Sequence, residues 1–267
     1  MTKPPTSFLR ARFDARGGQT RLAALDCRAP LKIARTFPRG DGGVAVCVMD
    51  ASPGLLAGDA YALEFHVEAG ARVDVTTQGF TRVHPSRERP CSLETRLCVE
   101  AGAMLEWFPE SLLLFQDAVL EARTDVFLAR GATLLAGEVW GAGRIERGEA
   151  WRFARFRSAW HVEEDGAPLF ASSLDVSPLT FNPQRPGAMN KWTHAGAFWA
   201  FGAGADEALC EALWSELESD SSLSCAVYGG ASLLSRGGVM VSLLGRRAHD
   251  LSAMIGLLRA TAKRMMS

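Results

Sequence analysis

The sequence lacks any long run of apolar residues. Its longest apolar stretches, such as Leu112–Phe115, fall far short of the roughly 20 residues that a transmembrane helix needs. The first five residues, MTKPP, have no apolar core of the kind found in signal peptides. We therefore expect a soluble, cytoplasmic protein that does not bind membranes.

An excess of charge is also absent. The 267 residues include 29 Lys and Arg against 30 Asp and Glu, which gives a formal net charge of -1. A balanced chain has no overall field that would attract nucleic acid or an anionic membrane. We predict no nucleic-acid partner. Hydrophobic residues make up 48% of the chain, which is ample material for a packed core.

The usual signatures of catalysis and of metal binding are missing as well. There is no phosphate-binding Gly-x-x-x-x-Gly-Lys-Ser/Thr loop, no His-Glu-x-x-His motif and no Gly-x-Ser-x-Gly elbow. The six cysteines form no Cys-x-x-Cys pair, so we expect free thiols. The five histidines lie far apart, and a structural or surface role is favoured for each. A mixed metal site of His84 with Cys91 and Cys98 stays open, but its spacing matches no known structural zinc site.

What the sequence does contain is a repeat with a period of about thirty residues. An alternating strand, a Gly-Ala corner and a second alternating strand occur around Gly70, return around Gly102 and return more loosely around Gly131. Glycine readily adopts the positive φ that such a corner between strands requires. Repeats of this kind predict stacked β-units that bury their apolar faces against their neighbours.

The fold class predicted from this pattern is mainly β, with layered, stacked sheets and solenoid-like repeats. Residues 8–176 consist of short alternating runs separated by Gly and Pro, and residues 192–267 mix strands with two helices. The helices are expected over 206–218 and from Asp250 onward, where Asp250 could form the N-cap. Residues 178–191 are expected to form a surface loop. We predict a single domain over residues 1–267.

Two carboxylates stand out. Asp59 follows a glycine-rich loop, where a carboxylate commonly accepts a hydrogen bond from a turn N–H group. Glu138 lies inside the apolar stretch 134–140, where an unpaired charge would be costly. Arg144 is the nearest cation in the sequence, so an ion pair or a turn anchor is the favoured interpretation. Polar lining of an internal passage is the alternative.

Six segments resemble, in the same order, motifs of the urease accessory protein UreD family, also called UreH. The resemblance covers more than 200 residues, and it is carried by PLKIARTFP at 30–38, GLLAGD at 54–59, TTQGFTRV at 76–83, LEWFPE at 105–110, GRIERGE at 143–149 and YGGASL at 228–233.

The resemblance implies a urease maturation factor rather than an enzyme. Members of this family bind UreF, receive the nickel-charged GTPase UreG through UreF, and dock on apo-urease. Nickel is thought to pass through an internal polar tunnel, so the resemblance implies nickel in transit and no tightly bound cofactor. Asp59, Thr81 and Glu138 match polar positions that are proposed to line or gate this tunnel.

The chain also departs from the family pattern. Thr36 replaces a proline, and Phe80 is bulkier than the usual small residue. Ser172 and Ser173 stand where the family has a glutamate and an arginine. If that glutamate contacts nickel in relatives, this chain must route the ion differently or rely on hydroxyl groups and water.

Two alternative functions remain open at this point. One is a β-solenoid enzyme acting on a carbohydrate, in which Asp59, Glu106 or Glu138 would serve as paired carboxylates. The other is a stand-alone metal-binding protein, against which the scattered His and Cys residues argue.

Overall fold

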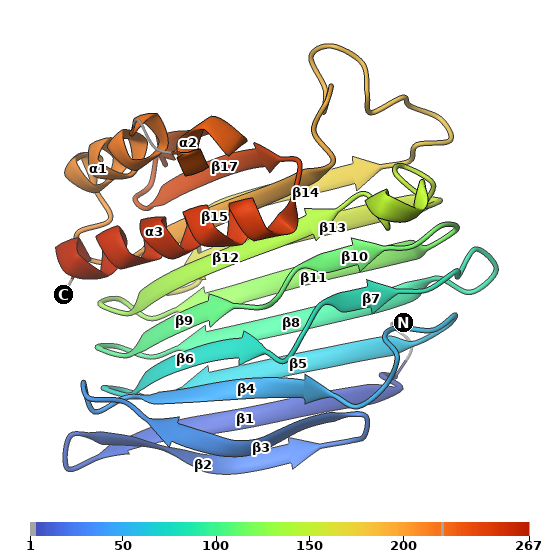
Figure 1. Ribbon diagram of the computed structural model, residues 1–267. Helices are drawn as coiled ribbons and strands as arrows, with labels where there is room; N and C mark the ends of the chain where they lie inside the picture. Colours follow the sequence, from blue (N-terminus) through green and yellow to red (C-terminus); the bar gives the residue numbers. More distant parts are fainter. Residues whose placement is uncertain (1–3, 220–221, 267) are drawn as a thin grey trace.

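Two β-sheets are stacked face to face, and helices cover the outer face of one of them (Figure 1). The computed structural model describes residues 4–219 and 222–266. The ends of the predicted domain, at 1–3 and 267, therefore lie outside the described residues. The mainly β, layered and solenoid-like fold predicted from the sequence is confirmed.

The first sheet, which we call sheet A, has seven strands in the order β14-β13-β11-β8-β5-β1-β2. Its five inner strands are parallel, and antiparallel strands close it at both edges. The strands are β1 (Ser7–Arg16), β2 (Gln19–Cys27), β5 (Ala60–Val67), β8 (Cys91–Val99), β11 (Val119–Leu128), β13 (Arg155–Glu164) and β14 (Ala167–Val176).

The second sheet, sheet B, has ten strands. Its main order is β16-β17-β15-β12-β9-β6-β4-β3, and two short strands, β7 and β10, extend it beside β12. The strands are β3 (Leu31–Pro38), β4 (Val44–Asp50), β6 (Arg72–Thr77), β7 (Thr81–Val83), β9 (Met104–Phe108), β10 (Leu112–Leu114), β12 (Thr133–Gly141), β15 (His194–Phe201), β16 (Val227–Leu233) and β17 (Val239–Gly245).

The three Gly-Ala corners of the repeat connect the sheets and stack on one another. Gly70, Gly102 and Gly131 have φ angles of +73°, +69° and +80°, as the sequence predicted. Successive corners are joined by backbone hydrogen bonds, for example from Met104 N to Ala71 O and from Gly102 N to Gly131 O. Each repeat therefore forms backbone hydrogen bonds with the repeat before it, which explains why the inner strands of both sheets are parallel.

The corner conformation can be tested at Gly102. No atom lies within 4 Å of the place where a Cβ would sit, so Gly102→Ala adds only backbone strain. We expect it to lower the free energy of unfolding by about 1–2 kcal/mol. Gly256 is an exposed glycine inside a helix with equally free space, and Gly256→Ala should raise stability by about 1 kcal/mol. Urea denaturation measures both, and equal effects of the two substitutions would contradict the assigned conformation.

The helical part differs in detail from the prediction. The structure has α1 (Glu207–Glu218), α2 (Ser222–Ala226), α3 (Ala248–Met266) and a short 3-10 turn, η1 (Ile145–Arg147). The apolar run at 225–228 is typical of a strand, but α2 covers its first two residues and β16 begins at Val227. Asp250 is not the N-cap of α3: it lies in the first turn and accepts hydrogen bonds from Arg247. Asp206 does cap α1, by accepting from Leu209 N.

Two hydrophobic layers result from this arrangement. The larger fills the space between the sheets, and the other lies between sheet B and the helices α1 and α3. The apolar face predicted for α3 is buried in the second layer through Leu251, Met254, Ile255 and Leu258. Because sheet B is covered on both faces, its strands place side chains alternately between the sheets and under the helices.

Most strand predictions hold, and the exceptions have local causes. The runs at 60–67 and 119–128, expected from the sequence to be strands, coincide with β5 and β11. The run expected to be a strand from Trp151 to Val162 begins later, as β13 at Arg155, because Trp151 has φ +62° and lies in a turn. Residues 177–193 form the long connection between β14 and β15, as expected for a surface loop (Figure 1). Within the described residues, no helix has the length and apolar character to cross a membrane.

Candidate functional site

A cavity of about 390 Å³ lies between the two sheets. Strands β5, β8, β11 and β13 form one wall, and β4, β6, β9 and β12 form the other. Its lining includes loop residues at 52–54 and 78–82 as well as Ser158 and Trp160 of β13. The stacked coils thus leave a hollow where the side chains do not fill the space between the sheets.

The rim of the cavity is built from three loops, at 52–54, 78–82 and 109–110. Phe80 lies at this rim and is 47% exposed, and Arg82 and Glu110 are exposed beside it. Thr81 lines the cavity here and holds its place through the pairing of β7 with β10 and a backbone bond to Ser111 O.

Inside the cavity, hydroxyl groups of sheet A form a short row. Thr95 on β8 and Thr124 on β11 lie directly opposite each other, and Thr124 is opposite Trp160 on β13. Ser158 projects from β13 two residues before Trp160. Because strand residues two apart share a face, these side chains all point between the sheets. The wall therefore supplies oxygen donors at intervals along the cavity.

Glu138 provides the carboxylate deepest in this row of polar groups. It projects from β12 into the cavity, and its Oε2 accepts a hydrogen bond of 2.9 Å from Nε1 of Trp160. The Trp160 ring stacks on Trp199 with centroids 4.2 Å apart. Burial raises the pKa of Glu138 to about 7, although the Trp160 hydrogen bond acts in the opposite direction. A carboxyl group that exchanges its proton near neutral pH thus faces the cavity.

The partner predicted for Glu138 is wrong. Arg144 does not pair with Glu138 but with Glu149, through Nε and Nη2, and it stacks over Phe115. Strand β12 ends at Gly141, and Arg144 lies beyond it, at the start of the turn η1. Glu138 instead lines the cavity between the sheets.

Asp59 lies outside the cavity lining. Its Oδ2 accepts a hydrogen bond of 2.8 Å from Leu56 N, which is the turn role considered for it. This bond holds the loop before β5, whose residues 52–54 contribute to the rim. The structure therefore brings Thr81 and Glu138 to one cavity and places Asp59 behind its entrance.

The two serines that depart from the family pattern have different positions. Ser172 pairs with Trp160 across β13 and β14 and is half-buried, whereas Ser173 is exposed. Ser172 therefore lies beside Trp160, the hydrogen-bond partner of Glu138, on the strand β14, which lies next to the cavity wall. Ser172 thus supplies a hydroxyl group at this position, and the carboxylate near Trp160 is that of Glu138.

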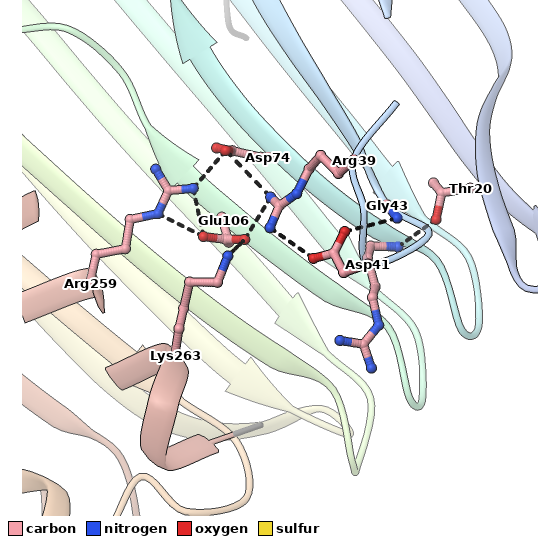
Figure 2. A network of polar contacts seen from close by, with 9 residues as sticks. Thr20, Arg39, Asp41, Gly43, Asp74, Glu106, Arg259 and Lys263 are labelled. Carbon is pink, nitrogen blue, oxygen red and sulfur yellow. Dashed lines mark hydrogen bonds and ion pairs between the residues drawn. The ribbon is translucent and has the colours of Figure 1, made fainter. Parts of the chain in front are cut away.

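Glu106 occupies a different setting, on the other face of sheet B (Figure 2). It is only 1% exposed, and its oxygens accept from Arg39, Arg259 and Lys263 at 2.8, 2.6 and 2.8 Å. Asp74 shares Arg259 at 2.6 Å. Burial alone would raise the pKa of Glu106, but these cations outweigh it and hold the pKa below its usual value. Glu106 fastens α3 to sheet B and does not pair with Asp59 or Glu138.

The described residues contain no group of three or more His, Cys, Asp or Glu side chains that could hold a metal ion. The sulfur of Cys91 instead donates to Leu56 O, and Nε2 of His84 lies 3.1 Å from Pro53 O. A cation in the cavity would meet several neutral oxygens and the carboxylates of Asp50, Glu110 and Glu138, which do not come together as one metal-binding group. Such a donor set favours weak, exchangeable binding over a fixed metal centre.

The buried carboxyl of Glu138 has a measurable effect on stability. Its pKa is raised in the folded state, so its contribution to stability is fully present below about pH 4.5 and is lost as the pH rises to about 7. Glu138→Gln removes this dependence and keeps an acceptor for Trp160. We expect the variant to match the wild type near pH 4.5 and to be more stable by up to about 3 kcal/mol at pH 8. Urea denaturation at the two pH values checks this, and a difference that does not change with pH would contradict it.

A two-sheet β-solenoid with a hollow, partly polar interior and a helical outer layer is the class of protein that this fold and cavity define. The model of the family described as "UreD urease accessory protein" matches residues 6–266, and the chain belongs to this family.

Curated relatives agree with this assignment. The chain is 30% identical over 262 residues to a protein named urease accessory protein UreD from Ralstonia nicotianae, covering 92% of this chain and 85% of the relative. It is 33% identical over 230 residues to the UreD protein of Cupriavidus pinatubonensis, covering 84% and 78%. A third UreD protein, from Acetivibrio thermocellus, is 27% identical over 253 residues, covering 94% of both chains. The family is thus named for an accessory protein of urease and not for a catalytic activity.

Proposed function

We propose that this chain is a urease maturation factor that holds a route for nickel between its two sheets. The observation that carries the proposal is the cavity of about 390 Å³, whose lining includes hydroxyl groups, the carboxylate of Glu138 and the carboxylates of Asp50 and Glu110. Family membership supplies the connection to urease. The cavity supports the proposal because it offers space and oxygen atoms between the two sheets.

The donors along this path suit an ion that has to move on. Nickel accepts carboxylate, hydroxyl and water oxygens, and no His or Cys side chain lines the cavity. Thr81 would meet the ion near the rim, and Thr95 and Thr124 would follow inside. Because Glu138 is about half protonated near pH 7, an ion that binds there displaces a proton, and binding weakens as the pH falls.

Asp59 contributes to this proposal indirectly. Its hydrogen bond to Leu56 N keeps the loop that carries residues 52–54 at the rim. We propose that Asp59 shapes the entrance and that Glu138 and Thr81 contact the ion. In this assignment nickel is cargo, and no cofactor stays bound.

The partners proposed for the chain are UreF, the GTPase UreG acting through UreF, and apo-urease, all in the cytoplasm. A protein that passes an ion to a buried site has to contact both the donor and the recipient. The near-neutral net charge agrees with docking through specific surfaces and not through a general electrostatic attraction.

The proposal can be tested by co-expressing the full chain with UreF, UreG and urease of the same operon. We expect a stable complex of the chain with UreF in a pull-down, and urease that contains nickel only when the chain is present. Formation of active, nickel-containing urease without the chain, together with no complex, would overturn the proposal. A complex without nickel dependence would leave a scaffold role and remove the nickel route.

A further inference from the structure

Apart from the three-residue strand β7, the two sheets end in four outer strands, and three of these carry features that prevent another strand from pairing with them. Open sheet edges invite association, and proteins protect them with charges, prolines or β-bulges. In sheet A, β2 carries Arg21 and Asp26, and β14 carries Pro168 and Asp175. Each of the two strands also contains an extra residue that breaks its register.

The outer strand β3 of sheet B is protected in the same way. It carries Lys32, Arg35 and Pro38, and its pairing with β4 shifts register after Ile33. The fourth outer strand, β16, has none of these features. Its sequence VYGGASL contains no charge and no proline, and its pairing with β17 is regular from Val227 to Leu233. No strand in the described part of the chain pairs with the outer edge of β16.

Exposed apolar side chains gather at this unprotected edge. Tyr228 is 66% exposed and Leu233 is 48% exposed, although both belong to a regular strand. The Tyr228 ring stacks on Trp192 with an interplanar angle of 10°. Trp214 of α1, which is 42% exposed, lies against Gly230, where a Cβ would come within 3.2 Å of its ring. Exposed Trp and Tyr residues of this kind are typical of protein interfaces.

Helix α1 adds a charge pattern to the same edge. Glu207, Glu211 and Glu218 are exposed and lie seven, three and four positions from Trp214, so all four side chains share one stripe of the helix. Helix α1 contains no basic residue. Because Trp214 marks the side of α1 that borders β16, the three carboxylates lie along the same border.

We propose that β16 binds an extended segment of another protein as an added strand. The segment would supply the missing backbone partners of β16. Its side chains would alternate between two surroundings: basic residues beside the carboxylates of α1, and apolar residues beside Tyr228 and Trp192. This inference concerns a docking edge and is independent of the nickel route.

A second copy of the chain is a less suitable occupant. Two β16 strands that paired around a two-fold axis would continue one sheet and place both α1 helices on the same face of it. The stripes of Glu207, Glu211 and Glu218 would then approach one another without a basic residue on either helix. Like charges at close range oppose such a contact, whereas a basic segment relieves them.

The test uses the full chain and three labelled seven-residue peptides with blocked ends. The first alternates Lys and Val, the second alternates Glu and Val, and the third repeats the first with every second amide N-methylated. We expect the Lys-Val peptide to bind at least tenfold more tightly than either control in fluorescence anisotropy. Hydrogen exchange should then slow at the amides of residues 227–233 and not at those of β14.

A matched pair of variants locates the site. Tyr228→Lys puts a charge on the edge of β16 at an exposed position, and Ser173→Lys does the same on β14. We expect affinity for the Lys-Val peptide to fall at least tenfold in Tyr228→Lys and to stay unchanged in Ser173→Lys. Ser173→Lys should unfold at the same urea concentration as the wild type, because its side chain faces solvent, and Tyr228→Lys should unfold only slightly earlier, because it loses the stacking on Trp192.

Three results would overturn the proposal. One is equal binding of the N-methylated peptide, which would mean that backbone pairing is not used. Another is protection of amides outside residues 227–233. The third is a dimer in analytical ultracentrifugation whose β16 amides are protected without peptide, since the occupant would then be a second copy.

Discussion

Glu106→Gln is expected to lower the free energy of unfolding by about 3 kcal/mol, because it leaves three cations around a position that loses its charge. Glu106 accepts from Arg39, Arg259 and Lys263, and it is almost completely enclosed under α3 (Figure 2). The cations come from the β3–β4 turn and from the last helix, so the substitution weakens the contact between the helical layer and sheet B. Urea denaturation with an unchanged slope measures the loss.

An exposed ion pair provides the matched control. Arg155 donates two hydrogen bonds to Asp175, at 3.0 and 2.7 Å, but both side chains are more than 40% exposed. Asp175→Asn is therefore expected to cost less than about 1 kcal/mol. A loss of the same small size in Glu106→Gln would contradict the role assigned to the buried network.

The pH dependence of the two buried carboxylates has opposite signs. The pKa of Glu106 is lowered in the folded state, so its stabilisation is present above the unfolded pKa near 4.5 and is lost as the pH falls through the folded pKa. The pKa of Glu138 is raised, so its contribution is lost as the pH rises. Glu106 lies opposite Leu135 on β12, three residues before Glu138, and the two side chains point to opposite faces of sheet B. The face of sheet B on which each carboxylate lies thus determines the direction in which its pKa is shifted.

The fold could be predicted from the sequence because its signals are local. The Gly-Ala corners at Gly70, Gly102 and Gly131 depend on one backbone conformation, and alternation of apolar residues marks the strands on either side. Short or continuously apolar strands such as β7, β10 and β15 have no such alternation, and they were not predicted. Helix α2 has only five residues, too few for a helical period to be visible.

The candidate site could be predicted only in part, because its contacts are long-range. Glu138 was identified by its apolar neighbours, but its partner is the indole of Trp160, 22 residues away and on the other sheet. The nearest cation in the sequence, Arg144, is therefore not the partner of Glu138. The three cations around Glu106 lie 67, 153 and 157 residues from it in the sequence. The stacking of the β3–β4 turn beside β9 and the packing of α3 on sheet B bring them together, and no local pattern encodes either contact.

Sequence motifs also grouped residues that the structure separates. Asp59, Thr81 and Glu138 were carried over together from the family resemblance, and the structure places only Thr81 and Glu138 at the cavity. A hydrogen bond to Leu56 N accounts for Asp59. Loop carboxylates have this local role so often that a motif match alone does not distinguish it from ion contact.

Glu138→Gln is expected to reduce the nickel content of co-expressed urease at least tenfold at limiting nickel, because it removes the carboxylate that lies beside the hydroxyl groups inside the cavity. The amide keeps the size of the side chain and can still accept the hydrogen bond from Trp160 Nε1. Metal analysis of purified urease measures the effect, and a pull-down with UreF verifies that the variant still assembles.

Asp59→Asn is the matched control for this experiment. It also replaces a carboxylate by an amide, but at a position outside the cavity lining, and the amide oxygen can still accept from Leu56 N. We therefore expect nickel content close to that of the wild type. Full nickel content in Glu138→Gln would exclude this carboxylate from the route. Equal losses of nickel in both variants would point instead to a change at the cavity entrance. The loop that Asp59 holds and the strand that carries Glu138 both border this cavity, and it is the feature they share.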